Sequence, residues 1–314
     1  MVLIELFHNI KKRFVAWYKK RFTVEGLENC ILPDKMYLKK LYKTRTGKEL
    51  NLKNPQTFSE KGNWLKLYDR RPEYTVMVDK YKAREYIAER LEGNHLVPLL
   101  GVWDSPDEID FDALPNEFVL KCNHDNGVII CRDKSKLNIE KVKSELAFRL
   151  SRDYYRKLRE WPYKDVPRKI ICEKLMFPRS GDKTVDYKLM CFDGKVKLIA
   201  LYAERFTGHL KEDYYTPEWK HVRVIDTDEA GDIYAKPEFF DEMVSIAERL
   251  SKGIPVLRVD FNIWQDMLAV GEMTFFHHGS MLPFINEWEK KTGEWIKLPE
   301  KYRRNICHSK NGQL

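Results

Sequence analysis

Two carboxylates, Asp260 and Glu272, have the spacing of a metal site. Asp260 lies in the apolar run VRVDFN and Glu272 in AVGEMTF, with a short turn between the two segments. We expect these segments to pair as strands, with Thr274 on the same face as Glu272 because side chains alternate along a strand. Mg²⁺ takes one or two protein carboxylates and completes its coordination with water and phosphates. The pattern predicts a Mg²⁺ site, and the alternative is a cross-strand ion pair of Glu272 with Arg258.

A second candidate site lies around Lys121. This lysine ends the apolar run FVLKC, and the polar loop 123–127 leads into a second apolar run. A lysine beside a loop with free backbone N–H groups suits the binding of a phosphate. Loops rich in Asn, Asp and Gly are also common as plain turns, so a structural hairpin is the alternative.

Two adjacent histidines, His277 and His278, follow the predicted metal strand closely. A histidine titrates near neutral pH and can accept a proton from an incoming amine. The two histidines are equally compatible with a role in orienting a substrate or in packing the loop. We therefore name both histidines as candidate catalytic residues.

The elements that must position these groups alternate between helices and strands. Residues 24–60 are predicted to be rich in loops, and residues 61–91 to form two helices broken at Arg71-Pro72. Strands are expected at 95–103, 117–124, 127–132, 168–176, 255–264 and 267–275, helices at 139–155 and 237–253, and a hairpin around the turn Asp193-Gly194. The order indicates an α+β fold with mostly antiparallel strand pairs.

The composition narrows the class of protein. With 314 residues, 43% hydrophobic and 33% charged, the chain is long and apolar enough to bury a sizeable core, so a disordered chain is excluded. The net charge is +8, of which residues 1–23 carry +5. The rest of the chain is only mildly basic, which argues against nucleic acid as a partner.

Residues 1–23 read as a basic amphipathic helix, with apolar residues three and four apart and lysines and arginines between them. Such a helix suits the surface of an anionic membrane, and a terminal helix packed on the body is the alternative. The six cysteines have no zinc-site spacing, and we find no secretory signal. We expect a cytoplasmic protein, peripheral on the inner face of the cell membrane if the helix binds there.

The motifs, taken in order, resemble one family of enzymes. The blocks are Asp79-Lys80 with Arg84, Lys121 with its loop, Glu173-Lys174-Leu175, Asp186-Tyr187-Lys188, Arg258-Val259-Asp260 and Glu272-Met273-Thr274. They follow the order of ATP-grasp enzymes such as the D-alanine:D-alanine ligases and the tubulin-tyrosine-ligase-like enzymes. The closer resemblance is to the TupA-like ATP-grasp family, named for teichuronopeptide biosynthesis, and it covers roughly residues 50–298.

The resemblance implies a fold and a domain organisation. It implies two α+β lobes with mostly antiparallel sheets that hold ATP between them. The expected parts are the basic helix at 1–23, a helical and α+β region at 24–114, a first lobe at 115–185, a second lobe with the metal and acceptor site at 186–300, and a tail at 301–314.

The resemblance also implies a role for each site residue. Arg84 and Lys121 would bind the ATP phosphates, together with Lys188. Glu173, Lys174 and Leu175 would form the strand edge that holds adenine through backbone groups, and Asp186 would face the ribose or the acceptor. Arg258 would stabilise charge in the tetrahedral intermediate. Asp260 and Glu272 would hold Mg²⁺, with Thr274 at the third metal position, where the family typically has Asn.

The implied activity is an ATP-dependent ligation. An amino-acid amine would be joined to a carboxylate, a uronic acid of a capsular or cell-surface polysaccharide, through an acyl phosphate, giving ADP and phosphate. The loop FFHHGSM departs from the acceptor loop of the dipeptide ligases, so their substrates do not carry over. Two alternatives stay open: a glycosyltransferase of the same pathway, and a non-catalytic scaffold at a membrane surface.

Overall fold

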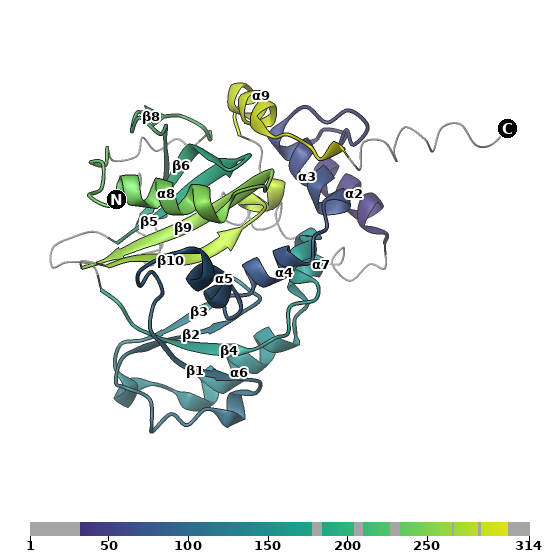
Figure 1. The fold of residues 1–314 in the computed structure, drawn as a ribbon. Coiled ribbons are helices and arrows are strands. Elements are labelled where there is room, and N and C mark those ends of the chain that lie inside the picture. The colour runs from purple at the N-terminus through teal and green to yellow at the C-terminus, as the bar shows by residue number, and fades with distance from the viewer. Residues whose placement is uncertain are drawn as a thin grey trace, which may run out of the picture.

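The computed structural model describes residues 32–177, 184–203, 210–226, 233–265, 267–281 and 284–300. The basic helix expected at 1–23 and the tail at 301–314 lie outside the described residues. Within them the chain forms two antiparallel sheets with helices around them, which confirms the expected α+β class. The two sheets lie one above the other in Figure 1.

The first sheet has four strands in the order β1-β4-β2-β3. The strands are β1 (Leu99–Trp103), β2 (Phe118–Cys122), β3 (Val128–Cys131) and β4 (Ile170–Lys174). Helix α6 (Ile139–Ser151) packs on β2, and Phe118, Leu120 and Leu146 are fully buried between them. This small core fixes the β2–β3 hairpin, from which Lys121 and the loop after it project.

The second sheet has six strands in the order β10-β9-β5-β6-β7-β8. The strands are β5 (Val185–Phe192), β6 (Lys195–Ala203), β7 (Lys211–Tyr215), β8 (His221–Val222), β9 (Val256–Trp264) and β10 (Met267–Thr274). The predicted turn between β5 and β6 is confirmed, with φ of 51° at Asp193 and 75° at Gly194, the left-handed pair that a tight hairpin requires. Helix α8 (Phe240–Leu250) packs on β5, β6 and β9 and encloses the main core.

The helices correct three sequence-based predictions. In the region predicted to be rich in loops, the described residues 32–60 include a helix that was not predicted, α2 (Asp34–Thr46), which begins after Pro33 and is followed by Gly47 with φ of 72°. Residues 61–91 belong to three helices rather than two: α3 (Phe58–Tyr68), α4 (Glu73–Val78) and α5 (Ala83–Arg90). The helix expected at 139–155 ends at Ser151, and α7 (Tyr154–Leu158) follows it.

The extra break between α4 and α5 has a local cause. The side chain of Asp79 accepts hydrogen bonds from the backbone N–H groups of Tyr81 and Lys82 at 2.9 and 3.3 Å. These bonds replace the helical pattern, as Asp side chains do in turns. Lys80 lies in this break, between the two helices.

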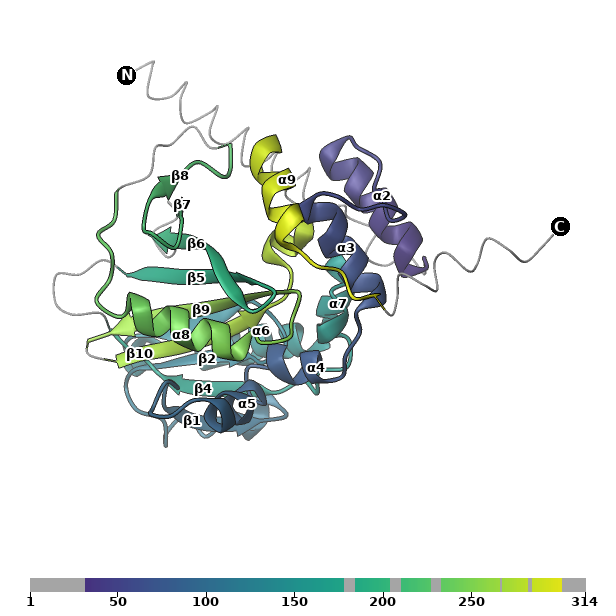
Figure 2. The same ribbon diagram turned by 45° about the horizontal axis from the view of Figure 1, so that its top comes forward.

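Helix α3 anchors the carboxyl-terminal part of the described chain. It packs against α9 (Asn286–Trp295) and against the short 3-10 helix η4 (His277–Ser280), as the second view shows for α3 and α9 (Figure 2). Three further 3-10 helices are η1 (Pro106–Glu108), η2 (Lys134–Lys136) and η3 (Trp161–Tyr163). Among the described helices, none is both long and apolar enough to span a membrane.

A buried carboxyl group joins α3 to α9 and makes stability depend on pH. Glu289 accepts hydrogen bonds from the backbone N–H and the hydroxyl of Ser59, and burial raises its pKa to about 7. From about pH 4.5 to about pH 7 the folded chain binds more protons at Glu289 than the unfolded chain does, so this group's contribution to stability falls as the pH rises. Above pH 7 both states are ionised and the loss is complete.

We predict that Glu289→Gln removes this dependence while keeping an acceptor for Ser59. The free energy of unfolding of the wild type, relative to the variant, should fall by up to about 3 kcal/mol between pH 5 and pH 8. Urea unfolding at several pH values measures it, with the exposed Glu287→Gln of the same helix as control. A difference that stays constant with pH contradicts the prediction.

Candidate active site

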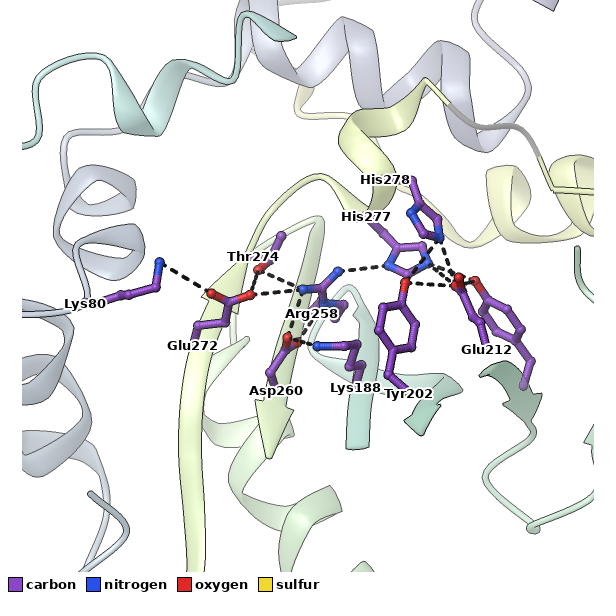
Figure 3. Close-up of polar contacts among 11 residues, drawn as sticks. Lys80, Lys188, Tyr202, Glu212, Arg258, Asp260, Glu272, Thr274, His277 and His278 are labelled. Atoms are coloured by element: carbon purple, nitrogen blue, oxygen red, sulfur yellow. Dashed lines mark hydrogen bonds and ion pairs between the residues drawn. The ribbon is translucent and has the colours of Figure 1, made fainter. Parts of the chain in front are cut away.

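The buried guanidinium of Arg258 on β9 is the centre of the candidate site. Its Nε and Nη2 donate to the two carboxylate oxygens of Asp260 at 2.6 and 2.8 Å. Nη2 also lies 3.2 Å from Glu272 and 3.2 Å from the hydroxyl of Thr274, and Nη1 lies 3.0 Å from His277 Nδ1. Figure 3 shows these contacts as one row of side chains across the sheet. The cross-strand ion pair of Glu272 with Arg258, left open by the sequence, is confirmed.

Strand register explains why these residues meet. Glu272 on β10 lies opposite Asp260 on β9, and Asp260 lies opposite Lys188 on β5. The same row continues through Ala200 on β6 to Tyr214 on β7. Alternation places all five side chains on one face of the sheet, while the neighbours of Asp260 in sequence point into the core under α8.

A second row lies next to the first on the same face. It runs from Asn262 on β9 through Asp186 on β5 and Tyr202 on β6 to Glu212 on β7. Asn262 donates to Asp186 at 2.6 Å. The predicted residue Asp186 lies two residues before Lys188 on β5, so the two side chains are on the same face of the sheet.

Charge compensation holds the centre together. Burial alone would lower the pKa of Arg258, but attraction to Asp260 and Glu272 outweighs it and raises the pKa. The amine of Lys188 adds a second short contact to Asp260, and both side chains are almost fully buried. Buried charges without partners are costly, so each group here depends on the others.

The donor set of Asp260, Glu272 and Thr274 fits Mg²⁺. All three offer oxygen atoms, which Mg²⁺ prefers, from adjacent strands on one face. The side chain of Glu272 is 32% exposed, and its second oxygen lies 3.5 Å from Lys80, so it is within reach of solvent. Both oxygens of Asp260 contact cations, and binding a metal there requires exchange of one such contact.

Lys80 connects the two sheets. Its amine donates to the backbone carbonyl of Asp125 at 2.6 Å, in the loop after β2, and lies 3.5 Å from Glu272 on β10. Its backbone N–H donates to the carbonyl of Asn123 at 3.1 Å. The loop that the sequence suggested as a phosphate cradle is therefore linked to the predicted metal site by one lysine.

The residues predicted to bind the nucleotide from the first sheet and from α5 (Ala83–Arg90) form a separate group. Lys121 lies 2.5 Å from Glu173, and Arg84 lies 3.6 Å from the same carboxylate. Strand β4 is flanked by β1 and β2, so Glu173 and Lys174 do not lie on a free lateral edge, and the N–H of Lys174 is bonded to Pro98. Only Leu175 lies beyond the carboxyl end of the strand.

Both rows end on β7, next to a cluster of side chains around Glu212. We define this cluster as Glu212, Tyr202, Tyr214, His277 and His278. Oε1 of Glu212 accepts from Tyr202 at 2.9 Å, from Tyr214 at 2.5 Å and from His278 Nε2 at 2.8 Å. His277 Nε2 lies 2.9 Å from the hydroxyl of Tyr214. Burial raises the pKa of Glu212, but its histidine partners outweigh this and lower it, so the group is a carboxylate.

The two histidines thus have different environments. His277 is fully buried, and desolvation lowers its pKa well below the ordinary value, so its ring is neutral. The side chain of His278 is 21% exposed and contacts Glu212 directly. Of the two predicted catalytic histidines, only His278 is partly exposed.

The turn that carries the histidines is strained and held from α3. His278, Gly279 and Ser280 have φ values of 49°, 61° and 49°, in the left-handed region that only glycine adopts readily. Asn63 donates to the carbonyl of Ser280 at 2.8 Å, and the buried amine of Lys66 donates to that of Gly279 at 2.5 Å. Such strain persists only where surrounding contacts impose it.

The structure adds site residues that sequence reasoning missed. Lys80 was named in the family block Asp79-Lys80 but was given no role, because nothing in its neighbours indicated a contact with β10. Glu212 lies in KEDYY, a polar segment for which no strand was predicted. Tyr202 was part of a predicted strand, with no signal that its hydroxyl faces a carboxylate.

A comparison with known families decides the assignment. A profile of the TupA-like ATP-grasp family matches residues 60–297. The chain belongs to this TupA-like ATP-grasp family. The resemblance found in the sequence is therefore confirmed, and with it the expected ATP-grasp fold, a class of ATP-dependent ligases. No curated protein matches the chain.

Three solved ATP-grasp structures are similar to the chain. An L-amino acid ligase from Bacillus licheniformis is 14% identical, with 74% of this chain and 51% of that chain covered and a TM-score of 0.45. A D-alanine–D-alanine ligase from Bacillus anthracis complexed with ATP is 15% identical, with 73% and 67% covered and a TM-score of 0.39. The ligase PsnB, complexed with a precursor variant, Mg and ADP, is 12% identical, with 76% and 60% covered and a TM-score of 0.38.

We predict that removing the central cation destabilises the fold. Arg258→Met leaves Asp260 and Glu272 without their shared partner, and the free energy of unfolding should fall by about 3–5 kcal/mol. Arg223→Met, which removes an exposed pair with Asp226 at 67% and 83% exposure, should cost less than about 1 kcal/mol. Urea unfolding of both variants compares the two losses. Equal losses contradict the central role of Arg258.

Proposed function

We propose that the chain is an ATP-dependent carboxylate–amine ligase that activates a carboxylate as an acyl phosphate and releases ADP and phosphate. The observation that carries this proposal is the continuous row of charges from Lys80 through Glu272 and Arg258 to Asp260 and Lys188. Such a row can neutralise a transferring phosphoryl group and hold it against a carboxylate.

ATP would lie between the two sheets. Arg84 on α5 and Lys121 on the first sheet would face its phosphates from one side and Lys188 on the second sheet from the other, while Glu173, Lys174 and Leu175 would line the adenine at the end of β4. Asp186 would face the ribose or the acceptor. Arg84 and Lys121 now lie against Glu173, so we propose that they exchange this carboxylate for phosphate oxygens when ATP binds.

Asp260, Glu272 and Thr274 would hold Mg²⁺, which neutralises phosphate charge when bound. Arg258, fixed by Asp260, would stabilise the negative charge that develops when the amine adds to the activated carbonyl carbon. The proposed first lobe, 115–185, thus supplies phosphate contacts, and the proposed second lobe, 186–300, supplies the metal and the acceptor site.

For the substrates we propose an amino acid as the amine and a uronic acid of a cell-surface polysaccharide as the carboxylate. The support is the family resemblance of the sequence, whose name refers to teichuronopeptide biosynthesis. An acceptor linked to a membrane lipid would also give residues 1–23 a role. We propose that this segment holds a cytoplasmic enzyme at the inner membrane face.

We predict ATP cleavage to ADP and phosphate that requires both a carboxylate and an amine. Phosphate release is measured over a matrix of uronic acids and amino acids, with Mg²⁺. Glu272→Gln and Asp260→Asn should lower kcat by at least about 100-fold, because each removes a proposed metal ligand. Glu287→Gln, an exposed change on α9, should leave the rate unchanged.

The products separate the proposal from its alternatives. AMP as product, or sugar transfer from a nucleotide sugar without ATP cleavage, would contradict the ligase. A fold stabilised thermally by sugar nucleotides but not by ATP would point to the glycosyltransferase instead. Binding to membranes with no ATP cleavage for any pair would leave only the scaffold.

We predict that residues 1–23 bind anionic membranes. The full chain should sediment with vesicles that contain phosphatidylglycerol and stay in solution with vesicles of phosphatidylcholine alone, because each cation contributes about 1 kcal/mol near an anionic surface. A chain that lacks residues 1–23 should stay in solution with both. Equal sedimentation of the two chains would contradict a membrane role for the segment.

A further inference from the structure

We propose that Glu212 and His278 form the binding site for the amine substrate, where Glu212 holds its ammonium form and His278 takes up its proton. The inference rests on the proposed ligase function and goes beyond it. In this inference, side chains on β7 and η4 recognise one of the two substrates. This substrate is a primary amine, which is a cation at neutral pH. Neither Glu212 nor its tyrosine partners was among the sequence-predicted site residues.

The first observation is the uneven use of the two oxygens of Glu212. Oε1 accepts from Tyr202, Tyr214 and His278, whereas no described residue donates to Oε2. The side chain of Glu212 is 12% exposed, and Oε2 is not one of the buried unpartnered atoms of the described residues, so this oxygen is open to a donor that enters from solvent. An ammonium group supplies such N–H donors together with a positive charge opposite the carboxylate.

The second observation is access. The side chain of Glu212 is 12% exposed and that of His278 is 21% exposed, whereas His277 beside them is 1% exposed. A small cation can therefore reach Oε2 of Glu212 and the ring of His278 but not His277. Tyr202 also lies under the amine of Lys188, 4.8 Å from ring centre to Nζ, which brings the cluster next to the proposed phosphate site.

The third observation excludes a competing occupant. One ligand atom each from Glu212, His277 and His278 lie within 4.8 Å of one another, a grouping that also suits a transition metal. Arginine has no acceptor, so the contact of Arg258 Nη1 with Nδ1 makes that nitrogen of His277 the acceptor. The proton of the neutral ring then lies on Nε2, which has no lone pair left for a metal.

The same contacts set the roles of His278. Its Nε2 lies 2.8 Å from the Glu212 carboxylate and therefore carries the proton that this bond needs. In the neutral ring Nδ1 is then the acceptor, and no described residue donates to it. His278 thus offers a base beside the carboxylate that holds the ammonium.

The chemical step is balanced within the site. The ammonium gives one proton to Nδ1 of His278, and the freed lone pair of the nitrogen attacks the carbonyl carbon of the acyl phosphate. The bond between that carbon and the bridging oxygen breaks, and phosphate leaves with the electron pair. A second proton leaves the nitrogen with the phosphate, and His278 returns its proton to solvent.

The test compares a charged with an uncharged nucleophile on the same activated carboxylate. Hydroxylamine is largely uncharged near neutral pH and needs neither the anion nor the base, whereas amino acids arrive as ammonium ions. In Glu212→Gln, kcat/KM for the amino acid should fall at least about 30-fold, while hydroxamate formation stays within about twofold of the wild type. Glu287→Gln should change neither rate.

The outcomes separate this inference from the ligase proposal. A wild type that forms neither amide nor hydroxamate with any carboxylate overturns both. An active wild type whose Glu212→Gln variant keeps its amide rate, or loses both rates equally while folded, overturns the amine site alone. Zinc or nickel that binds the wild type and is required for its amide rate also overturns it. If Glu212→Gln does not fold, the partly exposed His278→Gln should give the same split.

Discussion

The structure depends on the compensation of charge around one buried guanidinium. Arg258 contacts Asp260, Glu272, Thr274 and His277 from a buried position, with 10% of its side chain exposed, and its pKa is raised by the two carboxylates. Each of these groups would be costly to bury alone. The charged groups therefore exist only as a set, and strand register, which brings Glu272, Asp260 and Lys188 to one face, is what makes the set possible.

A second constraint holds the turn that carries His277 and His278. The turn of η4 has three successive left-handed residues and is tied to α3 by the side chains of Asn63 and Lys66. Burial lowers the pKa of Lys66 and raises that of Glu160 nearby, so this support is itself a buried ionisable pair. Gly62 is required in α3, because a Cβ there would lie 2.1 Å from the Ser280 hydroxyl. The helix thus positions His278 while touching no proposed substrate.

Two kinds of feature could be predicted from the sequence: those that depend on neighbouring residues, and those that belong to a known family pattern. The apolar strands around Asp260 and Glu272 and the turn at Asp193-Gly194 follow from alternation and turn chemistry, and the structure has them. Helix α2 is not evident in the sequence because Pro33 and Gly47, which flank it at its start and end, are also residues typical of loops. The contacts of Lys80 and Glu212 were not predicted for another reason: their partners lie on elements far away in the sequence, and a polar segment such as KEDYY carries no periodic signal.

The central claim is that the row of charges serves the transfer of phosphate to a carboxylate. Its most direct test follows oxygen atoms during one turnover. A uronic acid labelled with heavy oxygen in its carboxylate is ligated with ATP and an amino acid, and the released phosphate is analysed by mass spectrometry. Formation of an acyl phosphate predicts one labelled oxygen in each phosphate, because the carbon–oxygen bond of the activated carboxylate breaks. Unlabelled phosphate would contradict the account.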